Sequence, residues 1–324
     1  MTARSLNFLK GCEMTTPTLL DIAIQNGSDS AVGLIEETIK LIPEISGITE
    51  EGTRLSGVGA ARTIKGLSYK TLARTALPTV GFRDANDGTT ASKSNYENRT
   101  VETFILNPRW QCDKAVADKH EDGPALFIAR EAMGIMEASM QLLGTQFFYG
   151  RGTGDTKGHP GLVDSIQAAY TYDATGIGSV CSSVWGVRFG EQDVQWVWGD
   201  NGALQMADPR IQDITGANGS PLTGYIQELL AYPGVQVGSV YSLCRIKNIS
   251  ATASHTLTDA MIYALLSQLK KRPDVWFMTR RSREQLRASR TATNQTGAPA
   301  PLPTEAAGIP IAVTESILNT ETAA

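Results

Sequence analysis

The residue types that most often bind metals are scattered along this chain of 324 residues. Its cysteines lie far apart and form no C-x-x-C pair, at Cys12, Cys112, Cys181 and Cys244. Its histidines are equally dispersed, at His120, His159 and His255. A zinc site needs convergent thiolates or imidazoles, which are usually delivered in closely spaced pairs. We therefore predict no metal site, and we expect the cysteines to be reduced, mostly buried thiols.

A glycine-rich segment, GRGTGDTKG at residues 150–158, has the composition of a phosphate-binding loop. A Walker loop, however, has the pattern G-x-x-x-x-G-K-[ST] between a strand and a helix, so that amides at the helix start hold the phosphates. Here the glycines follow a predicted helix, and Lys157 precedes a glycine. We interpret the segment as a flexible exit from that helix. A soluble α/β enzyme that binds a phosphorylated ligand at this turn is kept as an alternative.

Motifs for nucleophilic or metal-assisted catalysis are missing from the sequence, which has neither a G-x-S-x-G elbow nor an H-E-x-x-H pair. The adjacent carboxylates Glu36 and Glu37, like Glu50 and Glu51, are interpreted as charges on solvated faces. We predict that the protein is not an enzyme, with no catalytic residue and no cofactor.

The most strongly charged segment runs from residue 270 to residue 290. It holds eight basic side chains against two acidic ones, namely Lys270, Lys271, Arg272, Arg280, Arg281, Arg283, Arg287 and Arg290. Nucleic-acid binding is one interpretation, but the only aromatic residues here, Trp276 and Phe277, alternate as in a buried strand and offer no stacking surface. Because the whole chain is near neutral, we favour salt bridges to acidic patches on identical neighbouring subunits.

The elements that carry these groups begin with short helices. Thr16 and Pro17 are typical of a helix start and predict a helix over Thr18–Gln25. A second helix is expected after Ser30, with Val32, Ile35, Ile39 and Ile42 on one face, ending at Pro43. Met14, directly before the capped helix, is an alternative start of the chain.

A long hairpin is predicted next. Ser68–Ala76 and Arg99–Leu106 have the β-branched and polar mixture of strands, and residues 84–95 between them are nearly all turn formers. Arms of nine or more residues span about 30 Å at roughly 3.3 Å per residue. A two-stranded hairpin is marginally stable alone in water. We therefore expect it to carry a mobile tip and to lie against a neighbouring subunit.

A long amphipathic helix follows, and then a mixed region. The helix is predicted over Pro124–Tyr149, with Asp122 as its N-cap and a length of about 39 Å at 1.5 Å per residue. The expected strands are Val184–Val187, Val194–Trp198, Ile211–Ile214, Gln236–Ser242, Val275–Met278 and Ile309–Thr314. The expected helices are Thr258–Lys271 and Ser282–Ser289. This order of elements predicts an α+β fold.

Composition narrows the class of protein further. Apolar residues make up 41% of the chain and charged residues 19%, which is enough for the core of one large domain or two ordinary ones. The net charge of −4 argues against a protein that mainly grips nucleic-acid phosphates. No run approaches about 18 apolar residues, so we predict no transmembrane helix. The apolar stretch near the N-terminus is too short for a signal peptide.

From about residue 15 onward, the chain resembles the major capsid proteins of tailed bacteriophages with the Hong Kong 97-like fold. The segments that carry the resemblance are TLLDIA at 18–23, RTALPTVGF at 74–82, VETFILNP at 101–108, GRGTG at 150–154, GHPG at 158–161, MTRRS at 278–282 and GIPIAVT at 308–314. The order of arm, long hairpin, long helix, glycine exit and mixed α/β region strengthens it.

The resemblance implies a division of the chain into the parts of that fold. Residues 1–66 would form an N-terminal arm and residues 67–108 the extended hairpin called the E-loop. Residues 109–160 would begin the peripheral domain, with its spine helix at 124–149. Residues 161–324 would supply interleaved segments of the peripheral and axial domains.

The resemblance also implies function and partners. Identical subunits would form hexamers and pentamers of the icosahedral virion capsid, assembled in the host cytoplasm around double-stranded DNA without sequence-specific binding. Because only sixty-odd residues precede the hairpin, a separate scaffolding protein is expected, together with a portal; decoration proteins are left open. An encapsulin-type nanocompartment shell is an alternative. The candidate intersubunit contacts are Arg74, Arg83, Asp84, Asn86, Asp87, Lys93, Arg280, Arg281, Arg283, Arg287 and Arg290.

Overall fold

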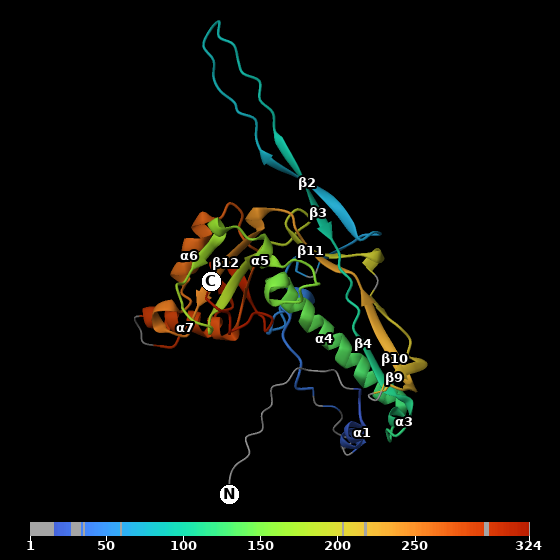
Figure 1. Ribbon diagram of the computed structural model, residues 1–324. Coiled ribbons are helices and arrows are strands. Elements are labelled where there is room, and N and C mark those ends of the chain that lie inside the picture. Colours follow the sequence, from blue (N-terminus) through green and yellow to red (C-terminus); the bar gives the residue numbers. More distant parts are fainter. Residues whose placement is uncertain are drawn as a thin grey trace. The chain divides into compact units, whose positions relative to one another are not determined.

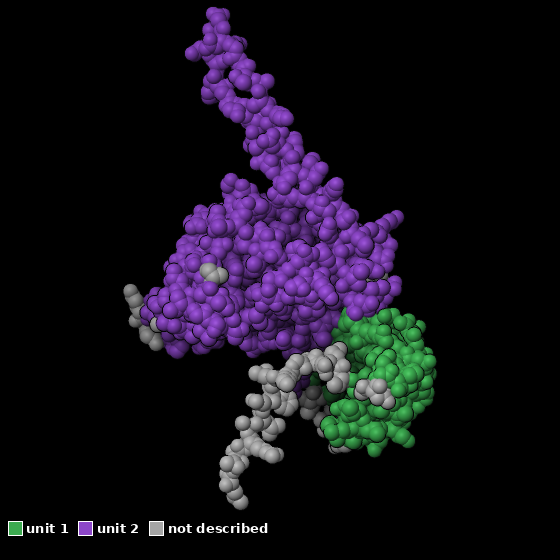
Figure 2. Space-filling model, in the orientation of Figure 1, with its two compact units in different colours: residues 1–36, 108–136, 206–229 green, residues 37–107, 137–205, 230–324 purple. Residues whose placement is uncertain are grey.

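The computed structural model describes residues 16–26, 34, 36–58, 60–202, 204–216, 219–294 and 298–323. The chain divides into two compact units (Figure 2). Unit 1 comprises residues 1–36, 108–136 and 206–229, and unit 2 comprises residues 37–107, 137–205 and 230–324. Cys12, the alternative start at Met14, and the predicted helical positions Val32 and Ile35 lie outside the described residues.

Unit 1 is built on one sheet and short helices. Its helices are α1 (Leu19–Asn26), α3 (Lys114–Ala117) and the first part of α4 (Pro124–Thr153). In the sheet, β10 (Pro221–Ala231) pairs with β4 (Arg109–Asp113), β8 (Leu204–Met206) and β9 (Arg210–Thr215). Helix α1 begins after Thr18, whose backbone N–H donates to the Asp21 carboxylate at 2.7 Å. Ile22 of α1 packs with Trp110 and Phe127 in a small core.

Unit 2 contains the main sheet of the protein, in the order β14-β15-β13-β6-β12-β5. Its strands are β5 (Thr171–Asp173), β6 (Ser182–Val187), β12 (Leu243–Ile249), β13 (Val275–Met278), β14 (Glu305–Ala306) and β15 (Ile309–Val313). Helices α6 (Asp259–Gln268) and α7 (Arg280–Thr293) lie beside it (Figure 1). Ile262 and Leu265 of α6 and Leu286 of α7 pack with sheet residues such as Met278.

Two smaller sheets complete unit 2. A three-stranded sheet has the order β1-β7-β11, formed by β1 (Ala61–Thr63), β7 (Val194–Trp198) and β11 (Pro233–Val237). The hairpin consists of β2 (Ser68–Ala76) and β3 (Asn95–Glu102). The remaining short elements are α2 (Pro43–Ser46), α5 (Leu162–Ser165) and 3-10 turns at Ala168–Tyr170, Asp200–Gly202, Val240–Ser242 and Ala253–His255.

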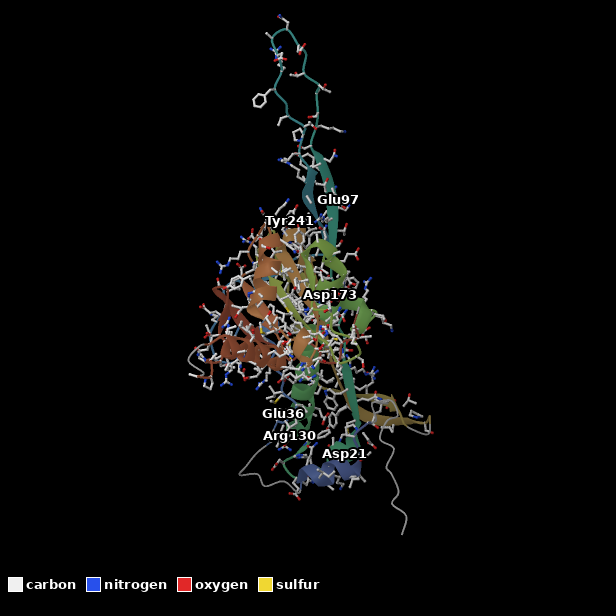
Figure 3. All side chains as sticks on the ribbon, turned by 90° about the vertical axis from the view of Figure 1, so that its left-hand side faces the viewer. Asp21, Glu36, Glu97, Arg130, Asp173 and Tyr241 are labelled. Atoms are coloured by element: carbon white, nitrogen blue, oxygen red, sulfur yellow. The ribbon has the colours of Figure 1, made fainter. Side chains whose placement is uncertain are left out.

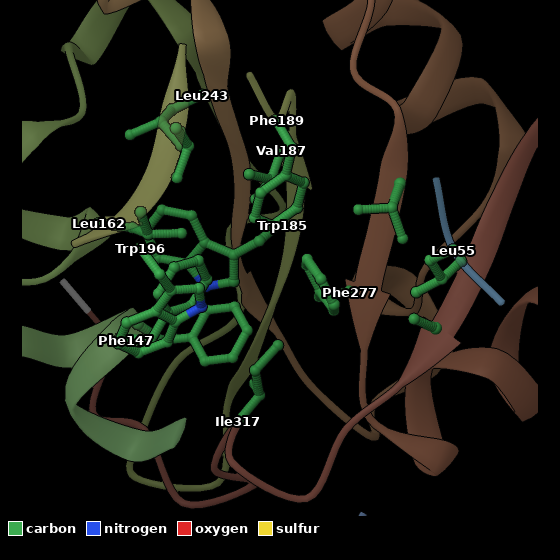
Figure 4. Packing of buried hydrophobic residues seen from close by; sticks show 14 of the residues in the cluster. Leu55, Phe147, Leu162, Trp185, Val187, Phe189, Trp196, Leu243, Phe277 and Ile317 are labelled. Atoms are coloured by element: carbon green, nitrogen blue, oxygen red, sulfur yellow. The ribbon is translucent and has the colours of Figure 1, made fainter. Parts of the chain in front are cut away.

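Aromatic side chains fill the centre of unit 2, where α4 meets the six-stranded and the three-stranded sheets (Figure 4). The Phe147 ring centroid lies 5.1 Å from that of Phe148 and 5.1 Å from that of Trp196. Phe148 in turn lies 5.6 Å from Phe277 of β13. Both phenylalanines of α4 and Phe277 are fully buried. The C-terminal part of α4 therefore joins the two sheets through one aromatic core.

Most predicted elements are confirmed, and the α+β class with them. The strands Ser68–Ala76, Val194–Trp198 and Val275–Met278 have the predicted bounds, and the long helix begins at Pro124 as predicted. Its end is also confirmed, because the backbone leaves helical geometry at Gly150, with φ 54° and ψ −138°.

Some predictions of secondary structure are wrong. The strand predicted over Arg99–Leu106 instead covers Asn95–Glu102, as β3. Residues 36–42 are not helical, and α2 instead begins at Pro43, where the predicted helix was to end. Proline lacks an amide hydrogen but has a helical φ, so it suits the first position of a helix. The predicted strand Gln236–Ser242 is cut short, because β11 ends at Val237 and Val240–Ser242 forms a 3-10 turn.

Candidate intersubunit surface

The end of the hairpin around Tyr69 and Arg99, which we call its foot, is bonded to the rest of unit 2. Strands β2 and β3 pair from Ser68 with Glu102 to Ala76 with Asn95, with a shift of register between Arg74 and Ala76. The Arg99 guanidinium donates to the carbonyl of Gly238 at 3.1 Å, and the Tyr69 hydroxyl donates to the side-chain oxygen of Gln236. These bonds connect the hairpin to the segment around β11, so the position of the foot is fixed relative to the three-stranded sheet.

The distal part of the hairpin, residues 77–94, is attached to nothing else in the described part of the chain (Figures 2 and 3). The bonds within it are local. Ser92 donates to the carbonyl of Thr79 at 2.8 Å, and Arg83 donates to the carbonyl of Asp87 at 2.7 Å. We call these 18 residues the tip. Because the tip has few internal contacts, its position depends on whatever lies against it.

Five of the predicted contact residues are brought together on the tip. Arg83, Asp84, Asn86, Asp87 and Lys93 are all exposed there. Asn86 has φ 73°, a left-handed conformation that asparagine tolerates in turns. The sixth predicted hairpin residue, Arg74, lies on β2 with its guanidinium 5.4 Å from the centroid of the Tyr96 ring.

Apolar residues of the tip are a feature that the sequence analysis missed. Leu77 is 72% exposed, Val80 is 89% exposed, and Phe82 is as exposed as in an isolated chain, at 110%. Scattered exposed apolar residues are ordinary, but three within six residues on a projecting loop indicate an interaction surface. The signal was present in the segment LPTVGF, whose apolar residues stand out in a stretch that otherwise consists of turn formers.

The arginines of the basic segment have partners inside the same subunit. Arg283 is nearly buried, and its guanidinium pairs with Glu50 at 2.7 Å and also with Glu51. Arg280 pairs with Glu50 at 3.0 Å. Glu50 and Glu51 are therefore partners of α7 and not free surface charges. The Arg283 side chain lowers the pKa of Glu51 below its usual range, against an opposing effect of burial.

The other three predicted basic contacts also bond internally. Arg290 forms a bidentate ion pair with the Asp259 carboxylate, with distances of 2.7 and 2.8 Å. This pair raises the pKa of Arg290. Arg287 donates to the carbonyl of Ala300 at 2.9 Å. Arg281 donates to the carbonyl of Val180 at 3.0 Å. A guanidinium that is already paired gains little from a second carboxylate, so this segment serves first to hold α7 onto its own unit.

The glycine-rich turn is tightly packed and internally bonded. Its organiser is Gln146 of α4, whose side-chain oxygen accepts from the Asp155 amide at 2.7 Å and whose amide donates to the His159 carbonyl at 2.7 Å. A Cβ on Gly150 would lie 2.2 Å from the Gly161 nitrogen, so only glycine fits.

Three amides in and beside this turn already have acceptors. Gly154 donates to Gly150 at 3.0 Å, Gly158 donates to Asp155 at 3.0 Å, and Gly161 donates to the Asp164 carboxylate at 2.9 Å. A phosphate loop needs such amides free. The segment is therefore an internally bonded turn and not a flexible connection after α4. These amides are not free to donate to a phosphate, which argues against the alternative of an enzyme that binds a phosphorylated ligand here.

A buried carboxyl group lies where residues 41–46 pass between α4 and the C-terminal segment. Glu44 is fully buried, and burial raises its pKa to about 7, although the nearby hydroxyls of Ser316 and Thr314 act in the opposite direction. A Cβ on Gly144 of α4 would come within 2.6 Å of the Glu44 Oε1 atom. The carboxyl group is thus packed directly against the helix backbone.

Within the ranges that the structure describes, no group of three or more His, Cys, Asp or Glu side chains could hold a metal ion. Among those same residues, no helix is both long and apolar enough to cross a membrane.

Comparisons with known proteins agree with the geometry. The model of the family "Major capsid protein GP7" matches residues 54–324. A solved structure of bacteriophage Epsilon15 is similar, with 21% identity and a TM-score of 0.69 over 96% of this chain and 98% of that chain. A search of the curated proteins found no match.

Two further solved structures are more distant. The capsid of Myoviridae phage XM1 has 10% identity and a TM-score of 0.46, over 69% of this chain and 97% of that chain. The SrpI encapsulin of Synechococcus elongatus PCC 7942 has 11% identity and a TM-score of 0.43, over 71% and 98%.

Proposed function

We propose, because this chain belongs to the major capsid protein GP7 family, that its hairpin is the E-loop with which each subunit of a phage capsid holds the next. The chain has the Hong Kong 97-like fold and forms the shell of the virion from identical copies. Membership of a structural family supports the prediction that the protein acts by assembly and not by catalysis.

The remaining parts of the fold are assigned in the same way. We propose residues 1–66 as the N-terminal arm and residues 67–108 as the E-loop. Helix α4 would be the spine helix of the peripheral domain, and the six-stranded sheet with α6 and α7 would form the axial domain. The pairing of β2 with β3 and the extent of α4 support this assignment.

The observation that carries the proposal is the incompleteness of the hairpin. Its foot is bonded to unit 2, whereas its tip exposes Val80 and Phe82 with no covering surface in the described chain. A two-stranded ribbon is marginally stable without a packing partner. In a closed shell, identical neighbours supply the missing surface in a repeated head-to-tail contact.

Further partners follow from the same proposal. A separate scaffolding protein would guide assembly, a portal would occupy one vertex, and double-stranded DNA would fill the shell without sequence-specific contacts. The chain's net charge of −4 supports a lining that does not retain DNA. Decoration proteins would bind the outside, if the phage encodes them.

Shortening the tip tests the proposed E-loop. Residues 80–91 would be replaced by Asn-Gly, which joins Thr79 to Ser92 through a two-residue turn. We expect an unassembled subunit with unchanged circular dichroism and melting temperature, because the tip contributes nothing to the core. Shell yield, measured by sedimentation and electron microscopy with the phage scaffolding protein co-expressed, should fall at least tenfold.

The comparison uses the wild-type chain under the same expression conditions. Wild-type shells together with equally abundant shells of the shortened variant would refute the role of the hairpin. An absence of wild-type shells would refute the assembly proposal itself.

A further inference from the structure

The apolar residues of the tip lie on one arm of the loop and not on both. Leu77, Val80 and Phe82 precede the turn at Asn86, while the returning arm is TTASKS at residues 89–94. Val80 and Phe82 lie two residues apart and are both almost completely exposed, whereas Leu77 lies five residues before Phe82. The tip therefore presents a small apolar surface formed by Val80 and Phe82.

A pocket in unit 2 has matching chemistry. Its walls are apolar, formed by Phe104, Ile105, Leu106, Leu142, Leu143 and Pro233. At its mouth, Ile105 is 70% exposed and Leu142 is 39% exposed. Gln146 and His159 also line it, and His159 is almost fully buried. A concave apolar pocket with exposed aliphatic residues at its entrance suits an aromatic side chain.

A second apolar pocket in unit 2 is less suitable. Ile45, Ala61, Leu143, Trp196 and Trp198 line it. None of its large side chains is strongly exposed, so its mouth offers little apolar surface to a partner.

The first pocket cannot receive the tip of its own subunit. It lies at the foot of the hairpin, since Phe104, Ile105 and Leu106 follow β3 directly. Phe82 lies 14 residues beyond Ser68, which pairs with Glu102 at the foot of the hairpin. At roughly 3.3 Å per residue, this separation is about 46 Å. The occupant must come from another molecule.

We propose that Phe82 of one subunit inserts into this pocket of the next subunit, with Val80 against Ile105. The inference rests on the proposed function, because the shell supplies the second copy at high local concentration. One surface at the end of the hairpin then meets a different surface at the foot of the next hairpin, which is a head-to-tail contact that closes into a ring.

The charged residues at both surfaces are compatible with this docking. Asp155 and Lys157 stand at the rim of the pocket. Arg83 and Asp84 directly follow Phe82 on the tip. Opposite charges can therefore face each other around the buried ring, where such pairs favour one register over others.

Engineered disulfides test the contact directly. The double variant F82C/I105C would be assembled into shells and oxidised, then examined by non-reducing gel electrophoresis. We expect a ladder of covalent oligomers in shells that dithiothreitol removes, and no ladder in dilute unassembled subunits. The matched control is F82C/I177C, because Ile177 is 81% exposed and also lies in unit 2 but outside the pocket. It should give no ladder.

Shells of F82C/I105C without a ladder, or an equal ladder from the control, would overturn the inference while leaving the proposed function intact. A second measurement covers the case in which the cysteine variants fail to assemble. Phe82→Ser should lower the melting temperature of the shell, Phe82→Leu should restore most of it, and Leu77→Ser should change it less. Equal effects of Phe82→Ser and Leu77→Ser would also contradict the docking.

Discussion

The aromatic centre of unit 2 and the tip of the hairpin use the same residue type in opposite ways. Phe147, Phe148 and Phe277 are completely buried by their own chain, whereas Phe82 is completely exposed. The first three contribute to folding of the subunit, and the fourth can contribute only after another molecule arrives. The comparison predicts that the stability of the subunit and the stability of the shell depend on different residues, which mutation can separate.

The largest expected effect on the subunit comes from the aromatic centre. Phe147→Ala removes a ring that stacks with Trp196 and contacts Phe148, and it leaves a cavity between two sheets. We expect a loss of about 3–5 kcal/mol in the free energy of unfolding. Urea denaturation of the unassembled subunit measures it.

The control for this prediction is Phe82→Ala, which should change the free energy of unfolding by less than about 0.5 kcal/mol. A comparable loss in both variants would mean that the tip packs on its own subunit, and the distinction between the two regions would fail.

A pH-dependent effect of similar size is expected at Glu44. Its pKa is about 7 in the folded protein, compared with the ordinary 4.5, because the carboxyl group is buried. The folded state therefore holds the proton more tightly than the unfolded state. Subunit stability should fall as the pH rises from 4.5 to 7 and stay low above that, by a total on the order of 3 kcal/mol.

Glu44→Gln isolates this contribution, since it keeps the shape and removes the charge. Unfolding curves at pH 5 and pH 8 should differ less for the variant than for the wild type. An identical pH dependence in both proteins would show that Glu44 does not titrate in this range.

A smaller effect is expected where α7 is held to residues 50–51. Arg283→Met leaves Glu51 without its partner and leaves Glu50 paired with Arg280 alone, but both carboxylates are partly exposed and can rehydrate. The loss should be about 2 kcal/mol, less than for a fully buried pair. Arg280→Met is the matched control, because its side chain is 56% exposed and should cost less than about 1 kcal/mol.

Thermal unfolding of the unassembled subunits distinguishes these variants. Normal subunit stability in Arg283→Met, combined with failed assembly, would instead favour a contact of Arg283 with the neighbouring subunit. That outcome would place α7 among the parts that stabilise the shell, and not among those that stabilise the subunit.

The sequence was most informative where local pattern decides structure. The apolar, β-branched and aromatic residues of Val194–Trp198 and the apolar stripe of α4 each determine an element through a short-range pattern. The strand β10 was not predicted, because it spans Gly224 and several polar residues that are accommodated by pairing with β4 and β9.

The candidate site was less predictable because it, too, depends on contacts between residues far apart in the sequence. Turn-forming residues identified the tip, but the partners of Arg283 are more than 230 residues away along the chain. The pocket at Ile105 and Leu142 likewise joins residues from separate segments. Only the folded chain shows which charges are already satisfied and which apolar residues remain uncovered.

The bonds of Tyr69 and Arg99 to Gln236 and Gly238 give the hairpin a fixed pivot. With an arm of about 46 Å, a rotation of about 5° at that pivot moves the far end by about 4 Å. Small adjustments near β11 are thus magnified into displacements the size of a side chain. A single polypeptide could therefore fit the differing angles of five-fold and six-fold rings by a small rotation of the hairpin about this attachment, without a change in its hydrophobic core.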